Sequence, residues 1–342
     1  MRIAINGLGR IGRNVVRVLF ESERYSEVQL VGVNDLGSAE ALAYLLQYDS
    51  THGPSAFDVD WCEDAGQQAL VIDGQRIPTW QEADAENLPW ADLNVDLVLE
   101  CSGVYRNRQA AQKHIDAGAT AVLVGAPGTD ELDCTVVYGV NHESITGQDR
   151  ILSNASCTTN CVAPILQVLS DQVGIEAGLL TTIHSYSNNQ SLIDTVHADA
   201  RRGRSATQSL IPTASGALTA LKQVLPEVGA TIKGYSMRVP TVNVAAADLS
   251  LQLDRDVSAE EVNGWLRAAV ENDPFGILDY NERPLVSIDF KHNSASSIFD
   301  ATQTQSVGRM LKLVAWYDNE WGYSHRMLDV GQHWFQKHST YQ

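Results

Sequence analysis

Short apolar runs alternate with amphipathic segments in the first half of the chain. Residues 2–6 (RIAIN) and 28–34 (VQLVGVN) have the apolar and β-branched character of buried strands, and residues 11–23 between them follow a helical pattern. The alternation continues with a strand at 95–101, a helix near 107–117 and a strand at 120–125. Strands that alternate with helices predict a parallel, doubly wound α/β sheet over roughly the first 150 residues.

The pattern changes after about residue 175, where longer alternating stretches predict strands at 178–184, 231–239, 241–253 and 309–316. These fit a mostly antiparallel sheet that leaves one face for helices, such as 258–271, which opens with the capping box Ser258-x-x-Glu261. We therefore expect a first domain at 1–156 and an α+β domain at 157–319. A C-terminal helix within 320–342 should pack back on the first domain.

Composition and charge narrow the class of protein. A length of 342 residues suits two domains, and no apolar run reaches the ~18 residues of a membrane span. Residues 1–9 begin a strand and a glycine turn where a secretion signal would place basic and apolar segments, so we expect a cytoplasmic protein without a membrane partner. The net charge of −18 disfavours nucleic acid as a partner. An anionic ligand must therefore be held by a local basic cluster.

A glycine-rich run, Gly7-Leu8-Gly9-Arg10-Ile11-Gly12, lies between the first predicted strand and the first helix. In this place the G-x-G-x-x-G spacing is typical of a dinucleotide-binding, Rossmann-type sheet, because the glycines let a pyrophosphate approach the backbone at a helix N-terminus. Asp35 ends the second strand, where a carboxylate would accept hydrogen bonds from ribose hydroxyls and repel a 2′-phosphate. The pattern predicts NAD as cofactor; the alternative is a plain glycine turn beside an exposed aspartate.

A candidate nucleophile follows in the run SNASCTTNC, residues 153–161, which leads directly into a helical pattern. Cys157 falls at or just before the helix N-terminus, where the dipole and a nearby imidazolium would lower the thiol pKa. The alternative is a buried, inert cysteine, which is the expectation for Cys62, Cys101 and Cys134. Cys161 could pair with Cys157 in a disulfide or a metal site, but no third ligand accompanies them, and we predict no metal.

His184 ends an apolar strand and opens a polar loop, SYSNNQ. A strand-end histidine is often structural, but a cysteine, a histidine and NAD together make one reaction chemically coherent. The thiolate attacks an aldehyde, the imidazole takes the hydroxyl proton, hydride leaves for the nicotinamide, and a thioester results.

Basic residues gather in DARRGR, with Arg201, Arg202 and Arg204, and in MRVP, with Arg238. In an acidic chain, guanidinium groups close to hydroxyls suit an oxyanion or a phosphate. Salt bridges explain Arg201 and Arg202 equally well. For Arg238, between a strand and a proline, we favour ligand binding.

Five runs, AINGLGRIGR, NASCTTNC, TTIHS, MRVPT and WYDNEWGYS, resemble the glyceraldehyde-3-phosphate dehydrogenase superfamily in order and over nearly the whole chain. The step of 27 residues from Cys157 to His184 also matches that family. The resemblance implies a homotetramer that acts on a small phosphorylated aldehyde, with residues 1–156 as the NAD-binding domain and 157–319 as the catalytic domain.

The resemblance assigns a role to each matching residue. Cys157 becomes the nucleophile and His184 the base. The cofactor would contact Gly7, Gly9, Arg10, Ile11, Gly12, Asp35, Ser102 and Asn319. Ser187 and Arg238 would bind the substrate phosphate, and the attacking phosphate would meet Ser156, Thr158, Ser215 and Gly216.

Two branches of the superfamily compete. The runs YLLQYDSTHG, VVYGVN, ATQSLIP and ILDYNERPLVSIDFKH resemble the erythrose-4-phosphate dehydrogenase branch, which makes 4-phosphoerythronate for vitamin B6 (pyridoxine) synthesis by releasing a free acid. Asp35 and the run PTASGA resemble the glycolytic branch, which passes the acyl group to phosphate. The distinguishing runs favour erythrose 4-phosphate, with glyceraldehyde 3-phosphate as the alternative. A third hypothesis is a thiol sensor without turnover, although a sensor would need only the cysteine.

Two positions depart from the family pattern. Asn189 stands where an aspartate is usual in the loop after the histidine, and Ala83 stands near a customary arginine on the adenine side of the cofactor. Neither change touches the nucleophile or the base.

Overall fold

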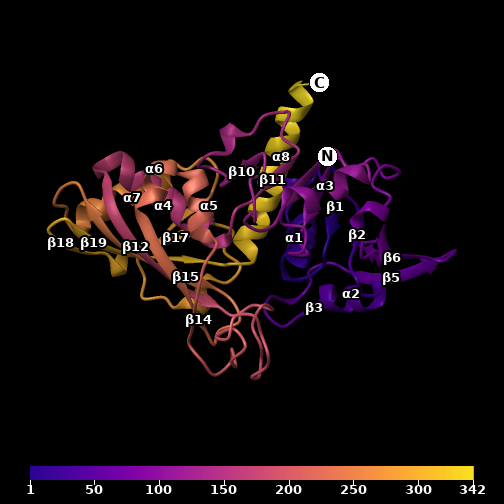
Figure 1. Cartoon of the computed structure of the whole chain (residues 1–342), viewed down its shortest axis with the longest axis horizontal. Helices are drawn as coiled ribbons and strands as arrows, with labels where there is room; N and C mark the ends of the chain where they lie inside the picture. Colours follow the sequence, from indigo (N-terminus) through magenta and orange to yellow (C-terminus); the bar gives the residue numbers. More distant parts are fainter. Residues whose placement is uncertain (342) are drawn as a thin grey trace. The chain divides into compact units, whose positions relative to one another are not determined.

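The computed structural model describes residues 1–341, which divide into two compact units (Figure 1). The first unit comprises residues 1–155 together with the chain from Ser324 onward, and the second is Ser156–Tyr323. The sequence placed the first boundary at 156/157 and the second at 319/320.

Within the described part of the first unit, nine strands form one sheet in the order β10-β11-β9-β8-β1-β2-β7-β6-β5. The pairs from β10 to β7 are parallel, which confirms the predicted doubly wound sheet, and β6 and β5 extend it as an antiparallel meander. The strands of the unit are β1 (Arg2–Asn6), β2 (Gln29–Asn34), β3 (Tyr48–Asp49), β4 (Gly53–Pro54), β5 (Val59–Asp64), β6 (Gln67–Ile72), β7 (Gln75–Trp80), β8 (Leu97–Glu100), β9 (Ala121–Val124), β10 (Cys134–Thr135) and β11 (Ile151–Ser153).

The central strands of this sheet are buried on both faces, which is why their sequences read as continuous apolar runs rather than alternating ones. Ala4, Val98 and Val122 belong to one core cluster with the fully buried Trp90. The helices of the unit are α1 (Arg10–Glu21), α2 (Ala39–Gln47), α3 (Arg108–Asp116), most of α8 (Trp321–Tyr341), and the 3₁₀ turns η1 (Glu23–Tyr25), η2 (Ala85–Asn87) and η3 (His142–Ser144).

The C-terminal helix α8 is anchored in the first unit by polar contacts. The Trp334 indole donates to the carbonyl of Asp149 at 2.7 Å, and the Tyr25 hydroxyl lies 2.9 Å from Nδ1 of His325 and 3.1 Å from Asp329. These bonds tie the end of the chain to its first 150 residues.

The second unit is built on an eight-stranded sheet in the order β13-β14-β12-β15-β19-β17-β16 with β18 beside β19, counted over Ser156–Tyr323. It is mostly antiparallel, as predicted, with β12 and β14 parallel and β16 and β17 parallel. Its strands are β12 (Ile175–Ser185), β13 (Ile211–Thr213), β14 (Ile232–Val239), β15 (Ala245–Leu253), β16 (Leu278–Asn281), β17 (Ser297–Asp300), β18 (Gln305–Val307) and β19 (Met310–Tyr317).

Helices cover one face of this second sheet (Figure 1). The long helix α4 packs on β15, β17 and β19, and the predicted helix α7 is capped by the Ser258 hydroxyl, which accepts the Glu261 N–H. The other face leaves apolar side chains exposed, among them Leu179, Ile183 and Tyr235. The helices are α4 (Cys157–Val173), α5 (Ala217–Val224), α6 (Pro226–Thr231), α7 (Ala259–Glu271), and the 3₁₀ turns η4 (Ser287–Phe290) and η5 (Ala301–Gln303).

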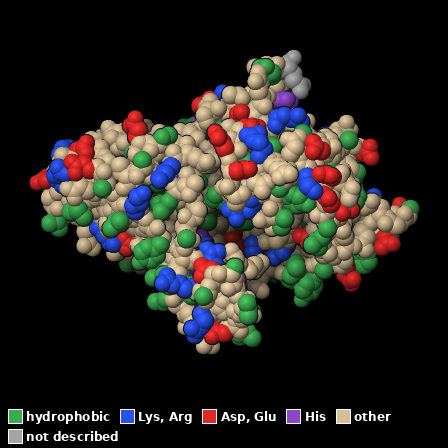
Figure 2. Space-filling view, viewed as in Figure 1, with side chains coloured by type: hydrophobic (Ala, Val, Ile, Leu, Met, Phe, Trp, Pro, Cys, Tyr) green, Lys and Arg blue, Asp and Glu red, His purple; other side chains and the backbone are tan. Residues whose placement is uncertain are grey.

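A long segment, residues 186–210, joins β12 to β13 and projects beyond the end of the sheet (Figure 1). Its surface mixes apolar, basic and acidic side chains (Figure 2), including the highly exposed Val196 and the ion pair between Arg204 and Asp194. Over residues 1–341, no helix combines the length and apolar character that crossing a bilayer requires.

Candidate active site

A cavity of about 420 Å³ opens in the first unit at the carboxyl ends of β1, β2 and β8. Ligands of doubly wound sheets bind at this edge, where loops after neighbouring strands meet. The residues that line it include Gly7, Gly9, Asp35, Ala83 and Ser102. All five belong to the predicted site or are its noted departure, and the fold gathers them from four loops into one pocket.

The glycine loop is shaped for close backbone approach. Gly7 has φ +91°, and a Cβ there would lie 2.5 Å from the backbone N of Ser102. A Cβ on Gly12 would lie 2.1 Å from the carbonyl oxygen of Gly7, so the first turn of α1 packs directly on the loop. A Cβ on Gly9 would meet nothing within 4 Å. The loop therefore presents open space and the N-terminus of α1 to a ligand, as a pyrophosphate requires.

Asp35 lies against this loop and is held by two backbone donors. Its Oδ2 accepts the Leu8 N–H at 2.7 Å, and its Oδ1 accepts the Gly37 N–H at 2.9 Å. A fixed carboxylate here suits ribose hydroxyls and disfavours a 2′-phosphate, so these residues fit NAD.

Two further predicted cofactor residues, Arg10 and Ile11, begin helix α1. The Arg10 guanidinium forms an ion pair with Asp49, including a bond of 3.1 Å from Nη2 to Oδ1, so its charge is already partnered. Ile11 is half-buried in the first turn of α1. The side chain at position 83 is a methyl group, and the Ala83 carbonyl accepts the Tyr105 hydroxyl at 2.8 Å. The side chain of Ala83 therefore contributes only an apolar methyl group to the pocket wall.

The candidate nucleophile and base meet in the second unit. Cys157 is the first residue of α4 and His184 is the penultimate residue of β12; Sγ lies 3.5 Å from Nε2. Two features set the start of α4. Ala155 adopts a left-handed φ of 53°, and the Ser156 hydroxyl caps the helix by accepting the Thr159 N–H at 3.0 Å. The sequence predicted both positions but could not show that they meet.

The electrostatics of this pair differ from the prediction. Burial raises the pKa of the Cys157 thiol, although the Arg238 charge and local hydrogen bonds oppose the rise. Burial, followed by the Arg238 charge, lowers the pKa of His184 to about 3. The expectation of a depressed thiol pKa was wrong for this state because desolvation outweighs the helix N-terminus. The resting pair is a neutral thiol beside a neutral imidazole.

Arg238 lies beside the histidine because β14 and β12 are paired with His184 opposite Arg238. Nη1 of Arg238 lies 2.7 Å from Nδ1 of His184 and donates to the Ser185 carbonyl at 3.0 Å. That carbonyl is also 2.7 Å from Nδ1. Nδ1 thus has two competing partners: when it accepts from Arg238 the ring proton is on Nε2, and when it donates to the Ser185 carbonyl Nε2 keeps a lone pair for the thiol. The second tautomer is the one that a base requires. Ser187 is exposed at the start of the following loop, where its N–H donates to Gln190.

The predicted residues for an attacking phosphate gather at the starts of α4 and α5. Thr159, one turn into α4, donates its hydroxyl to the Ala217 carbonyl of α5 at 3.1 Å. Ser215 and Gly216 directly precede α5 and thus lie near the start of α4 with Ser156. Two helix N-termini with hydroxyl side chains are suited to an anion.

Thr158 and a tyrosine that the sequence analysis did not select form another contact of the site. The Thr158 hydroxyl lies 2.9 Å from the hydroxyl of Tyr317, and the Tyr317 ring stands T-shaped to His184 at 6.0 Å between centroids. The Ser185 hydroxyl donates to Oδ1 of Asn319 at 3.0 Å, which fixes the orientation of that amide. Tyr317 and Asn319 both lie in the run WYDNEWGYS, which was the signal for this part of the site.

Among residues 1–341, one group of metal-ligating side chains comes together, His142, Glu143 and His333, with ligand atoms within 4.8 Å of one another. Nδ1 of His142 accepts the Gly139 N–H at 3.1 Å, so the proton of its neutral ring is on Nε2. Lys337 also pairs with Glu143 at 2.8 Å. A metal would have to displace the Nε2 proton of His142 and compete with the Lys337 ammonium for Glu143.

The dinucleotide pocket and the cysteine–histidine pair define the class: an NAD-dependent oxidoreductase that acts on an aldehyde group. Models of the glyceraldehyde 3-phosphate dehydrogenase NAD binding domain and C-terminal domain match residues 1–108 and 156–319. The chain is 48% identical over 332 residues to the chromosomal glyceraldehyde-3-phosphate dehydrogenase of Cupriavidus necator, which covers 96% of this chain and 97% of that protein. It is 52% identical over 329 residues to the glyceraldehyde-3-phosphate dehydrogenase of Pseudomonas aeruginosa, with 96% of each chain covered. The chain belongs to the glyceraldehyde 3-phosphate dehydrogenase family, which confirms the resemblance to that superfamily.

Proposed function

We propose that this enzyme oxidises glyceraldehyde 3-phosphate with NAD and inorganic phosphate to an acyl phosphate. The observation that carries the proposal is the name shared by relatives at 48% and 52% identity along nearly the whole chain. The hydroxyls at the starts of α4 and α5 support it, because they offer a place for the attacking phosphate.

Erythrose 4-phosphate, which the sequence runs favoured, becomes the second candidate. The most distinctive of those runs, residues 277–292, folds into β16 and η4. In the sheet order, β15, β19 and β17 separate β16 from β12, the strand that carries His184. The strand of this run is therefore separated from the strand that carries His184, while the end of the run, at His292, donates its N–H to Asp318 at 2.9 Å.

The first step uses the cysteine–histidine pair as the structure presents it. The Cys157 thiol gives its proton to Nε2 of His184 while sulfur attacks the aldehyde carbon, and the imidazolium proton is held by the Ser185 carbonyl on its other side. The imidazolium passes its Nε2 proton to the former carbonyl oxygen, which gives the neutral thiohemiacetal and restores neutral His184. His184 then takes that hydroxyl proton as base while NAD, when bound, would accept the hydride, and a thioester remains on Cys157. Phosphate attacks the thioester carbon, and the thiolate leaves.

The remaining site residues position the reactants in this proposal. Arg238 and Ser187 bind the substrate phosphate, and Asn319, oriented by Ser185, holds the nicotinamide carboxamide. The acceptor phosphate is bound by Ser156, Thr158, Ser215 and Gly216. NAD is held by Gly7, Gly9, Arg10, Ile11, Gly12, Asp35 and Ser102.

NADH formation with each aldehyde, with and without inorganic phosphate, tests the proposal. We expect glyceraldehyde 3-phosphate to give the higher kcat/KM and NADH formation to depend on phosphate. Phosphate-independent oxidation of erythrose 4-phosphate with the higher kcat/KM would assign the second candidate, with 4-phosphoerythronate as product.

We also propose a homotetramer in a reducing compartment such as the cytoplasm. The exposed apolar side chains on the open face of the second sheet support assembly. A catalytic thiol that must stay reduced supports the compartment.

A further inference from the structure

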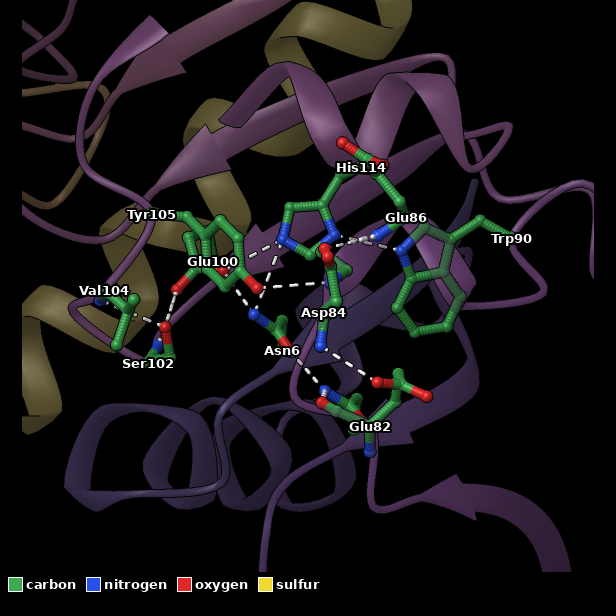
Figure 3. A network of polar contacts seen from close by, with 12 residues as sticks. Asn6, Glu82, Asp84, Glu86, Trp90, Glu100, Ser102, Val104, Tyr105 and His114 are labelled. Carbon is green, nitrogen blue, oxygen red and sulfur yellow. Dashed lines mark hydrogen bonds and ion pairs between the residues drawn. The ribbon is translucent and has the colours of Figure 1, made fainter. Parts of the chain in front are cut away.

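A polar network with a buried centre lies beneath the cofactor pocket of the first unit (Figure 3). Its centre is Glu100, the last residue of β8, which is 1% exposed. Oε2 of Glu100 accepts from Asn6 and lies 3.0 Å from Nε2 of His114, which is itself 0% exposed. Oε1 accepts the Ser102 N–H at 2.8 Å and the Ser102 hydroxyl. No predicted role of the site uses this carboxylate.

Trp90 decides which nitrogen of His114 carries the proton. The indole Nε1–H, which can only donate, lies 3.0 Å from Nδ1 of His114. Nδ1 therefore accepts, and the proton of the ring is on Nε2, aimed at Glu100. His114 is thus an uncharged donor with a fixed tautomer, and the Glu100 carboxylate is satisfied by four neutral donors rather than by a cation.

This arrangement fixes what Ser102 can offer to a ligand. Its hydroxyl proton goes to Glu100, and its oxygen already accepts the Val104 N–H at 3.1 Å. A hydroxyl has one proton and two lone pairs, so one lone pair remains. Ser102 is exposed and lines the cavity, where it can accept a hydrogen bond but cannot donate one. In a dinucleotide the ribose hydroxyls can donate to it, whereas the pyrophosphate oxygens cannot.

The other side of Glu100 reaches a second wall of the same pocket. Oδ1 of Asn6 accepts from Asn34 at 2.7 Å, and Asn34 makes two bonds of 2.9 Å to the backbone of Glu82. With its amide group turned by Glu100, Asn6 presents its oxygen to Asn34. The network therefore ties together the ends of β1 and β2 and the loops that follow β7 and β8 (Figure 3).

We propose that Glu100, with its partner His114, is a positioning residue for NAD. It holds the Ser102 hydroxyl as an acceptor for a ribose hydroxyl and sets the spacing of the loops around the pocket. The inference rests on the proposed placement of Ser102 in the cofactor site.

A double-mutant cycle tests it through the Kd of NAD, measured by calorimetry on the full chain. A glutamine at position 100 has an NH2 group in place of one carboxylate oxygen. In one orientation of the amide this NH2 group faces the donors of Asn6 and His114, and in the other it faces the Ser102 N–H. We expect Glu100→Gln and Ser102→Ala each to weaken NAD binding roughly tenfold, because a lost hydrogen bond to a charged or fixed partner has about that effect. The double variant should be weakened by clearly less than the hundredfold product, because both changes remove the interaction made by the Ser102 hydroxyl. In steady-state assays KM for NAD should rise more than kcat falls.

Several outcomes separate the explanations. Glu86→Gln, an exposed acid nearby, is the control and should leave Kd unchanged. Unchanged Kd in Ser102→Ala would remove Ser102 from the cofactor site and leave the dehydrogenase function intact. A weakened Ser102→Ala with an unaffected Glu100→Gln, or additive effects in the cycle, would overturn the role of Glu100.

His114 gives a second test if Glu100→Gln does not fold. A glutamine at position 114 can accept from Trp90 through its oxygen and donate to Glu100 through its nitrogen, whereas leucine can do neither. We expect His114→Gln to keep the NAD affinity and His114→Leu to weaken it severalfold. Equal affinity in the two variants would contradict the positioning role.

Discussion

At the scale of single residues, the proposed chemistry depends on a cysteine and a histidine that are both neutral at rest. Their proximity, 3.5 Å from Sγ to Nε2, lets the proton transfer accompany the attack on the aldehyde. The Arg238 charge lowers the pKa of both partners. For His184 it adds to the effect of burial, which also lowers the pKa, and for Cys157 it opposes burial, which raises the pKa.

Removing the Arg238 charge should therefore raise the pKa of the Cys157 thiol. In Arg238→Ala, the rate of alkylation by iodoacetamide at Cys157 should reach its half-maximum at a higher pH than in the wild type. Arg204→Ala, which removes an exposed arginine paired with Asp194, is the matched control and should leave the profile in place. A shift of the Arg238→Ala profile to lower pH would show that the charge acts in the opposite sense.

His184 should also make the folded state less stable in acid. Its folded pKa of about 3 is below the ordinary 6.5, so between these values the unfolded chain binds a proton that the folded chain does not. Stability is therefore complete above the unfolded pKa and declines as the pH falls below it. From pH 7 to pH 5 the loss from this residue is about 2 kcal/mol, at 1.36 kcal/mol per pKa unit.

Urea unfolding of the wild type and of His184→Asn at both pH values measures this contribution. The variant should lose about 2 kcal/mol less between pH 7 and pH 5. An identical loss in both proteins would mean that His184 is protonated in the folded state at pH 5.

At the scale of elements, the turn between β1 and α1 is held by two glycines with different tasks. In Gly7→Ala the new methyl group would collide with the Ser102 backbone at a positive φ, so the free energy of unfolding should fall by roughly 1–3 kcal/mol. In Gly9→Ala the methyl group meets no protein atom within 4 Å, so stability should be retained while NAD binding weakens. Thermal unfolding and NAD titration of both variants separate the two tasks, and a destabilised Gly9→Ala with normal NAD affinity would refute this assignment.

At the scale of the whole molecule, the net charge of −18 repels anions. We therefore expect anionic ligands to bind only where arginines or helix N-termini lie. The open face of the second sheet has a different character, with Leu179 64% and Tyr235 45% exposed. Patches of this kind mark contacts between proteins.

Sedimentation tests the proposed assembly. Four chains of 37.3 kDa should give a particle of about four times that mass, and Leu179→Lys should reduce it to smaller species. Val307→Lys, at an 81% exposed position on β18, is the control and should leave the mass unchanged. A wild-type monomer at micromolar concentration would contradict the homotetramer.

The sequence predicted elements best where burial was uniform. The first strand was predicted at its observed bounds because β1 is buried on both faces. The strands β5 to β7 were missed, because this acidic stretch is half exposed and lacks a clear period. The strand predicted from 241 begins at Ala245, since Val244 has φ 62° and breaks the extended backbone.

The sequence by itself determined which residue types are available for the proposed chemistry. The glycine spacing, Asp35, Cys157 and His184 are local signals, since each depends on residue type and on the element beside it. The tertiary structure alone decided which groups meet and in what state. The pairing of β12 with β14 puts Arg238 beside His184, and packing around Cys157 reverses the expected direction of its pKa. It also buries Glu100, at the end of β8, against His114 of the following helix α3. Desolvation and hydrogen-bond geometry depend on neighbours distant in sequence, and no local pattern encodes them.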